Sequence, residues 1–156
     1  MPKDACLYLI PNTIGNNEID YSVPIVVKNV IKRLDHFIVE NEKKARSLIK
    51  LVAPEKDQGK IFINVINKHA SINESKSFLG ACLDGYSIGL ISDAGCPAIA
   101  DPGSSIIYEA HYLKIKVRPL VGASSIFLAL MSSGMNGQSF SFNGYLPINQ
   151  KERRKK

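Results

Sequence analysis

Short apolar runs alternate with longer amphipathic stretches along most of the chain. The runs are rich in β-branched residues and have the length of buried strands, whereas the stretches repeat their apolar positions at helical spacing. The pattern predicts strands over residues 6–10, 36–40, 61–66, 87–92 and 116–120. It predicts helices over residues 23–34, 42–52, 74–83, 103–112 and 124–132.

This alternation of strands and helices favours one fold class. A strand, a crossover helix and a second parallel strand form a right-handed unit, and successive units build a sheet with helices on both faces. The sequence therefore predicts an α/β fold with a mostly parallel five-stranded sheet flanked by helices.

The chain changes character after the fifth predicted strand. Beyond residues 134–137 the pattern predicts a new strand over 139–146, with aromatic residues at Phe140, Phe142 and Tyr145. Because five strands complete a sheet of ordinary size, we expect this strand to belong to another unit. The prediction is an N-terminal α/β domain over 1–120, followed at 121–156 by a junction and the truncated start of a C-terminal α/β domain.

Composition sets bounds on class and compartment. Of 156 residues, 45% are hydrophobic and 22% charged, which is ordinary for a globular domain. No apolar run reaches the roughly 18–20 residues of a membrane span, and the first residues lack a signal-peptide pattern, so we expect a cytoplasmic protein with no membrane partner. The three cysteines are far apart without paired histidines, which predicts reduced thiols and no metal site.

Positive charge is concentrated at one place. The formal net charge is +6, and residues 151–156 contain five basic residues and one acidic residue. The remaining chain is therefore close to neutral. Such a basic cluster can neutralise phosphates, and a solvated helix start explains it equally well.

The most informative segment follows the strand predicted at 87–92. Residues 92–103, which we call the small-residue loop, are nearly all small, proline or aspartate. Ligands of open parallel sheets bind outside the carboxyl ends of the strands, and small residues let main chain approach a ligand closely. Asp93 places a carboxylate at the strand end that can accept hydrogen bonds from an amine or a hydroxyl. Asp101, before Pro102, is expected to cap the next helix.

Two other strand ends carry weaker signals. The first loop (residues 10–17) has one glycine where a dinucleotide fingerprint needs three, so a phosphate-binding loop is disfavoured, and a structural turn or a ligand contact remains open. The junction (residues 120–125) places a glycine and two serines at the domain boundary, where either a ligand cleft or a serine helix cap explains them. The histidines form no readable Ser/His/Asp triad.

These strand ends carry a resemblance to a known family. The segment LISDAGCPAIADPG (residues 90–103) resembles the characteristic loop of the tetrapyrrole methylase superfamily, in the form found in small-subunit ribosomal RNA cytidine 2′-O-methyltransferases. Four further segments resemble the same branch in the same order: LYLIPNTIGN, FIVENEKKARSLI, VRPLVGASSIFLALMSSGM and FSFNGYLP. The resemblance covers essentially the whole chain.

The resemblance implies a class III methyltransferase fold, in which two α/β domains hold S-adenosylmethionine between them, as a homodimer without metal. The implied activity is 2′-O-methylation of a ribose in small-subunit ribosomal RNA, with the ribosomal subunit as partner. No catalytic residue is identified. The implied cofactor contacts are Pro11, Asp93, Ala94, Gly95, Ala98, Ile99, Ser124 and Ser125.

Departures from the branch bear on the substrate. Where the branch has a Glu-Asp-Thr-Arg run facing its substrate, residues 40–46 read Glu-Asn-Glu-Lys-Lys-Ala-Arg, and Lys43, Lys44 and Arg46 favour contacts with RNA phosphates. The junction also reads Val-Gly-Ala in place of Pro-Gly-Pro. Two alternatives stay open: a methyltransferase acting on a tetrapyrrole, a corrinoid or another small molecule, and a non-enzymatic module that binds a nucleotide or a protein.

Overall fold

A computed structural model describes residues 5–15, 19–66 and 76–155. Five strands form one sheet of order β3-β2-β4-β1-β5, and every pairing is parallel. The predicted α/β fold with a five-stranded parallel sheet is confirmed. Each strand also lies within one residue of its predicted ends. The strands are β1 (Cys6–Ile10), β2 (His36–Val39), β3 (Phe62–Val65), β4 (Ile88–Ile91) and β5 (Lys116–Pro119).

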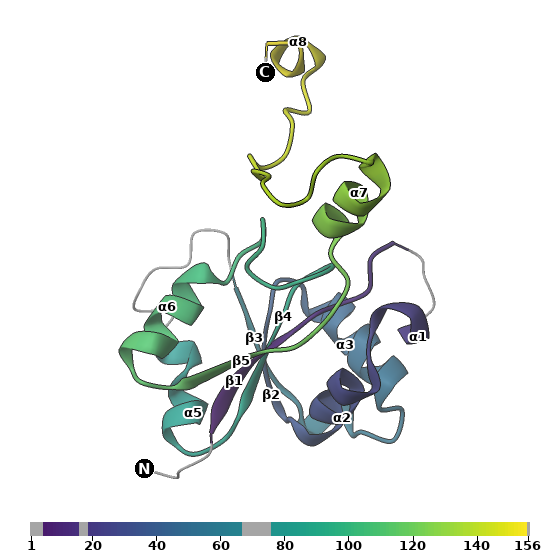
Figure 1. The fold of residues 1–156 in the computed structure, drawn as a ribbon. Helices are drawn as coiled ribbons and strands as arrows, with labels where there is room; N and C mark the ends of the chain where they lie inside the picture. Colours follow the sequence, from purple (N-terminus) through teal and green to yellow (C-terminus); the bar gives the residue numbers. More distant parts are fainter. Residues whose placement is uncertain (1–4, 16–18, 67–75, 156) are drawn as a thin grey trace. The chain divides into compact units, whose positions relative to one another are not determined.

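Helices cover both faces of this sheet. Figure 1 shows α1 (Ile19–Ser22), α2 (Ile25–Arg33) and α3 (Glu42–Val52) on one face, and α5 (Gly80–Leu83) and α6 (Ser104–Tyr112) on the other. A short 3-10 turn, η1 (Gln58–Lys60), precedes β3. Of the helix predicted at 74–83, the first two residues lie outside the described chain.

Two buried clusters follow from the alternation of side chains along the strands. Phe37 packs in the cluster under α2 and α3, whereas its neighbour Ile38 packs in the cluster under α5 and α6. At Gly89 on central β4, a Cβ atom would lie 2.6 Å from Ile10 Cδ1 and 3.0 Å from Phe37 Cδ1. Glycine therefore lets the side chains of both neighbouring strands close over β4.

Helix α3 presents its charged side chains at the carboxyl edge of the sheet. Asn41 caps the helix, because its side chain accepts a hydrogen bond from Lys44 N at 3.1 Å. The apolar face of the helix is buried in the cluster that covers β2. The polar face at the start of the helix, with Lys43 and Lys44, remains exposed.

The start of α6 corrects one prediction. The helix begins at Ser104 with Gly103 in the capping position, at φ +130°. Asp101 and Pro102 therefore lie in the loop before the helix, and the prediction that Asp101 caps it is wrong. Only glycine adopts this backbone conformation without strain, which explains why the helix starts later than the Asp-Pro pair suggests.

The chain divides into two compact units, residues 1–124 and 125–156. The second contains α7 (Ser125–Ser133) and α8 (Gln150–Arg153), and no residue of α7 is buried. The strand predicted at 139–146 is wrong, because this segment has no regular secondary structure. A strand needs a hydrogen-bonded neighbour, and all strands of the described chain lie in the sheet of the first unit. The predicted domain boundary at residue 120 stays a prediction.

No helix among the described residues has the length and apolar character needed to cross a bilayer.

Candidate ligand site at the carboxyl edge of the sheet

Strands β1 and β4 are neighbours in the sheet, and the chain leaves them in opposite directions. After β1 it passes through α2 to β2, and after β4 it passes through α6 to β5. Helices α2 and α6 lie on opposite faces of the sheet (Figure 1). In open parallel sheets, ligands bind in the crevice where such connections diverge. The first loop and the small-residue loop both start at this point.

Asn12 joins these two loops. Its main-chain N donates to Gly95 O at 2.9 Å, and its side-chain Nδ2 donates to Ser92 O at 3.0 Å and to Asp93 O at 3.3 Å. Asn12 is only 6% exposed, and a buried amide with this many partners fixes the loops it connects. The first loop therefore has a structural role through Asn12, which sequence reasoning did not single out.

The small-residue loop is held in a strained conformation. Gly95 has φ +63°, and the non-glycine residues Ala98 and Ala100 have φ +63° and +60°. A left-handed alanine costs roughly 1–3 kcal/mol and persists where the surrounding structure enforces it, as it often does at ligand sites. The short side chains leave the main chain of this loop accessible to a ligand.

The junction packs against both loops. A Cβ atom at Gly122 would overlap the ring of Pro11, and Cys96 Sγ donates to Ala123 O at 3.5 Å. A Cβ atom at Gly95 would lie 3.5 Å from the same Ala123 O. The three strand-end segments that the sequence singled out therefore come together at one edge of the sheet, within the first unit.

Asp93 lies among charged side chains at this edge. Its Oδ2 is 2.7 Å from Lys44 Nζ, and its main-chain N donates to Glu40 Oε1 at 3.2 Å. Burial raises the pKa of Glu40, the Asp93 N–H lowers it, and the charges of Asp101 and Asp93 raise it further, with Lys44 acting against them. The hydrogen bond to Asp93 raises the pKa of Lys44. The edge thus combines carboxylates that can accept hydrogen bonds with the ammonium group of Lys44.

A cavity of about 560 Å³ opens beside Asp93. It lies between the first loop, one side of α3 from its first turn to its last, and the end of β4. Its size suits a nucleoside-sized ligand. Its lining residues are Asn12, Thr13, Asn41, Lys43, Lys44, Ser47, Leu48, Leu51 and Asp93.

The predicted cofactor contacts have different surroundings. Pro11 and Gly95 are buried, Ala98 is half-buried, and Ala94 and Ile99 are exposed on the small-residue loop. Ser124 is half-buried at the end of the first unit. Ser125 belongs to the second unit, so its contact with a ligand stays a prediction.

The predicted substrate contacts on α3 do not all face this cavity. Lys43 and Lys44 line it. Arg46 is held elsewhere: its Nε donates to Glu42 Oε1 and its Nη1 to Gln58 O, both at 2.8 Å. Glu40 was missed as a member of the site, although a carboxylate in the last predicted position of a strand was the available signal.

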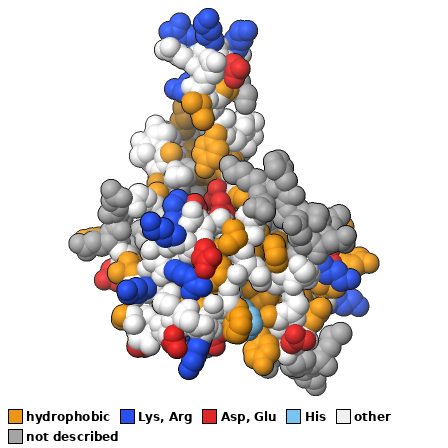
Figure 2. Space-filling view, turned by 180° about the vertical axis from the view of Figure 1, so that it is seen from behind, with side chains coloured by type: hydrophobic (Ala, Val, Ile, Leu, Met, Phe, Trp, Pro, Cys, Tyr) orange, Lys and Arg blue, Asp and Glu red, His pale blue; other side chains and the backbone are white. Residues whose placement is uncertain are grey.

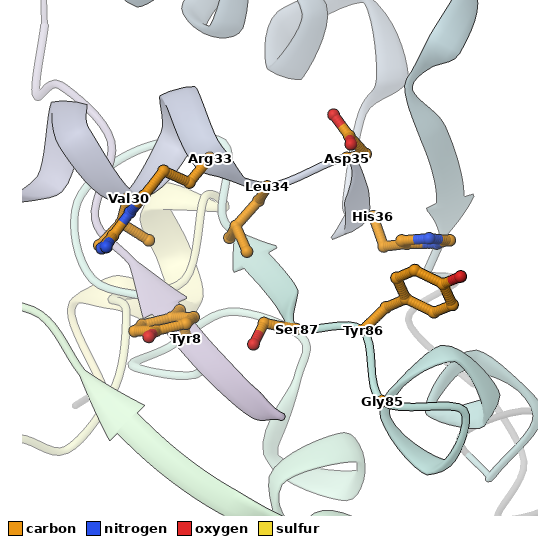
Figure 3. Close-up of a pocket in the computed structure, with 9 residues that line it drawn as sticks. All are labelled: Tyr8, Val30, Arg33, Leu34, Asp35, His36, Gly85, Tyr86 and Ser87. Atoms are coloured by element: carbon orange, nitrogen blue, oxygen red, sulfur yellow. The ribbon is translucent and has the colours of Figure 1, made fainter. Parts of the chain in front are cut away.

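A second cavity, of about 310 Å³, lies at the opposite ends of the strands. Figure 3 shows Val30 and Arg33 from α2 and Leu34 directly after it on one side, and Tyr8, Ser87 and Tyr86 on the other. None of the predicted site residues lines this cavity. Because open parallel sheets bind ligands at their carboxyl edge, we assign the functional site to the edge that carries Asp93.

The fold is a doubly wound α/β sheet, and the candidate site lies at its topological switch point. The described residues contain no group of three His, Cys, Asp or Glu side chains that could hold a metal ion. No family model matches the chain.

Curated proteins of one name are similar to nearly the whole chain. The ribosomal RNA small subunit methyltransferase I of Vibrio cholerae is 33% identical over 150 residues, which are 96% of this chain and 49% of that protein. The protein of the same name from Halalkalibacterium halodurans is 32% identical over 150 residues, covering 95% of this chain and 48% of that protein. The one from Neisseria meningitidis serogroup A is 31% identical over 149 residues, covering 96% and 48%.

By sequence, then, nearly the whole chain is similar to ribosomal RNA small subunit methyltransferases I, and the resemblance predicted from its motifs is confirmed. The chain spans about half the length of these curated relatives.

Proposed function

We propose that this chain forms the S-adenosylmethionine-binding part of a methyltransferase, and that the whole protein 2′-O-methylates a ribose in small-subunit ribosomal RNA. One observation carries the proposal: the three strand-end segments that resemble the methyltransferase branch meet at the switch point of the sheet, around Asp93 and Gly95. The names of the similar proteins support ribosomal RNA of the small subunit as the methyl acceptor.

The residues at this edge fit the chemistry of the cofactor. Asp93 is placed to accept hydrogen bonds from a hydroxyl or an ammonium group of the ligand. Main chain at Ala94, Gly95 and Ala98 can lie against the ligand without interference from long side chains. Pro11, Ile99 and the hydroxyls of Ser124 and Ser125 complete the set of proposed contacts.

The protein's part in the reaction is alignment. When bound, S-adenosylmethionine supplies a methyl group on a sulfonium, ready for in-line displacement by a hydroxyl. Asn12 and Glu40 hold the Asp93 main chain, so that the ligand is fixed in one orientation. Fixed geometry and a water-poor crevice are large contributions to such a transfer.

The acceptor side lies over α3 in this proposal. Figure 2 shows blue Lys and Arg side chains gathered over α3, with red acidic side chains among them. Lys43, Lys44 and Arg46 would contact phosphates of the RNA, and the basic residues of 151–155 add further positive charge. The proposal includes a homodimer in the cytoplasm and a reaction without a metal ion.

Radiolabelled methyl transfer tests the proposal. The full-length protein is incubated with labelled S-adenosylmethionine and small ribosomal subunits from a strain that lacks the gene. Label in the RNA is expected. Label on a corrinoid or a porphyrin, and none in RNA, would favour the small-molecule alternative. Calorimetry that detects no binding of S-adenosylmethionine would favour the non-enzymatic module.

A further inference from the structure

Lys44 and Asp93 form an ion pair at the entrance of the cavity. The Nζ–Oδ2 distance is 2.7 Å, and the two residues come from elements 49 positions apart in the sequence. Lys44 is 59% exposed and Asp93 33% exposed along their side chains, so solvent reaches both partners. Exposed ion pairs of this kind are weak and exchange their partners readily.

The same two residues line the cavity where the proposed ligands meet. Asp93 reaches it from the end of β4, and Lys44 from the first turn of α3. A ligand that hydrogen-bonds to Asp93, or that brings a positive charge beside it, weakens the attraction that holds the Lys44 ammonium. The flexible lysine stem then lets the ammonium turn to another anion.

We infer that Lys44 exchanges its anionic partner. Its ammonium pairs with Asp93 when no ligand competes for that carboxylate, and it pairs with a phosphate of the RNA when the methyl donor binds. This inference rests on the proposed function and adds a coupling between the two ligands. Because such coupling is reciprocal, bound RNA also strengthens binding of the methyl donor.

The ligand groups that the proposed function assigns to Asp93 are a hydroxyl and an ammonium. S-adenosylmethionine and S-adenosylhomocysteine share these groups, so either ligand competes with Lys44 for Asp93. The inference predicts that RNA binds more tightly to the ligand-bound protein than to the free protein.

S-adenosylhomocysteine, which has no methyl group to transfer, separates these states. The affinity of the full-length protein for a fluorescently labelled oligouridylate is measured without ligand and with S-adenosylhomocysteine at saturation. We expect binding about two- to fivefold tighter with the ligand, a limit set by the weakness of exposed ion pairs.

Lys44→Met tests the residue and Lys50→Met is its matched control. Lys50 lies on the same helix, is exposed, and does not line the cavity beside Asp93. Lys44→Met should weaken RNA binding by the ligand-bound protein and remove the difference between the ligand-bound and the free protein. Lys50→Met should keep that difference, whatever it does to overall affinity.

Two results overturn the inference: equal RNA affinity of the wild type with and without S-adenosylhomocysteine, or a difference that survives in Lys44→Met. Calorimetry of S-adenosylhomocysteine alone separates this failure from a failure of the proposed function. If the ligand does not bind, the proposed function fails and the inference fails with it. If the ligand binds but the coupling is absent, only the inference fails.

Discussion

The two ends of the parallel sheet each carry a cavity, and they are built from different material. The cavity at the carboxyl edge is lined by Asn12, Lys44 and Asp93, among others, and the neighbouring small-residue loop is held in left-handed conformations. The cavity at the amino edge is lined by a mixture of aromatic, aliphatic and charged side chains, with the His36 ring 5.3 Å from the Tyr86 ring. The difference teaches that a cavity alone does not mark the functional edge of the sheet. A neighbouring loop held in left-handed backbone conformations is the additional sign.

Among substitutions at the carboxyl edge, Gly122→Val should cause the largest losses in stability and in ligand affinity. Its Cβ would overlap the ring of Pro11, which cannot move aside as a flexible side chain would. We expect a loss of about 1–3 kcal/mol in unfolding free energy and about a hundredfold loss in affinity for S-adenosylhomocysteine, or about 2.8 kcal/mol. Thermal unfolding and calorimetry measure the two quantities.

Gly80→Ala is the matched control, because a Cβ at Gly80 meets no atom within 4 Å. It should leave both quantities nearly unchanged. If Gly122→Val bound S-adenosylhomocysteine with wild-type affinity, the junction would not be part of the site.

Asp93→Asn should cause the second-largest loss of ligand affinity. It removes the charge proposed to bind the cofactor and keeps the shape of the side chain, so affinity for S-adenosylhomocysteine should fall about tenfold or more, as for hydrogen bonds to charged groups. Asp35→Asn at the amino edge is the control, since Asp35 also pairs with a lysine, Lys56, at 2.8 Å. Equal losses in both variants would show that the effect is not specific to the carboxyl edge.

Asn12→Ala tests the connection between the loops. It leaves the main-chain oxygens of Ser92 and Asp93 without the side-chain donor, so we expect a loss of about 1–3 kcal/mol in unfolding free energy. Cofactor affinity should fall as well, because the small-residue loop loses its support. Denaturant unfolding provides the first value, with the exposed Asn29→Ala on α2 as a near-neutral control. An unchanged free energy in Asn12→Ala would contradict the structural role of the first loop.

Glu40→Gln should give the smallest effect, and one that depends on pH. Because the pKa of Glu40 is raised in the folded protein, its ionised form destabilises the fold at neutral pH, and this penalty disappears as pH falls through the raised pKa. The variant should therefore be slightly more stable than wild type at neutral pH, by a small amount because solvent screens this partly exposed group, with no difference in acid. Urea unfolding across pH checks this, and the exposed Glu42→Gln serves as control. A gain that persists in acid would contradict the stated cause.

The sheet was predictable from sequence because its strands are short apolar runs with strong periodicity. The small-residue loop was predictable from composition, since few other segments combine so many short side chains at a strand end. The contacts that organise the edge were not: the bonds of Asn12 join residues about 80 positions apart, and the Lys44–Asp93 pair joins residues 49 apart. Such pairs depend on strand order, which local patterns do not specify.

Two errors have local causes. The run at 139–146 has the composition of a strand, but a strand forms only beside a hydrogen-bonded partner. Asp101 precedes a proline as a helix cap does, yet the left-handed Gly103 delays the start of α6. In both cases the local sequence is typical of the predicted element, and the conformation of the surrounding backbone prevents that element from forming there.

Chemical-shift mapping of the isotope-labelled full-length protein with S-adenosylhomocysteine tests the central assignment most directly. The account predicts that amide signals of residues 12–15, 92–103 and 122–124 shift as ligand is added, while those of residues 8, 33–36 and 85–87 stay in place. Shifts confined to the second group would place the ligand at the amino edge and contradict the account.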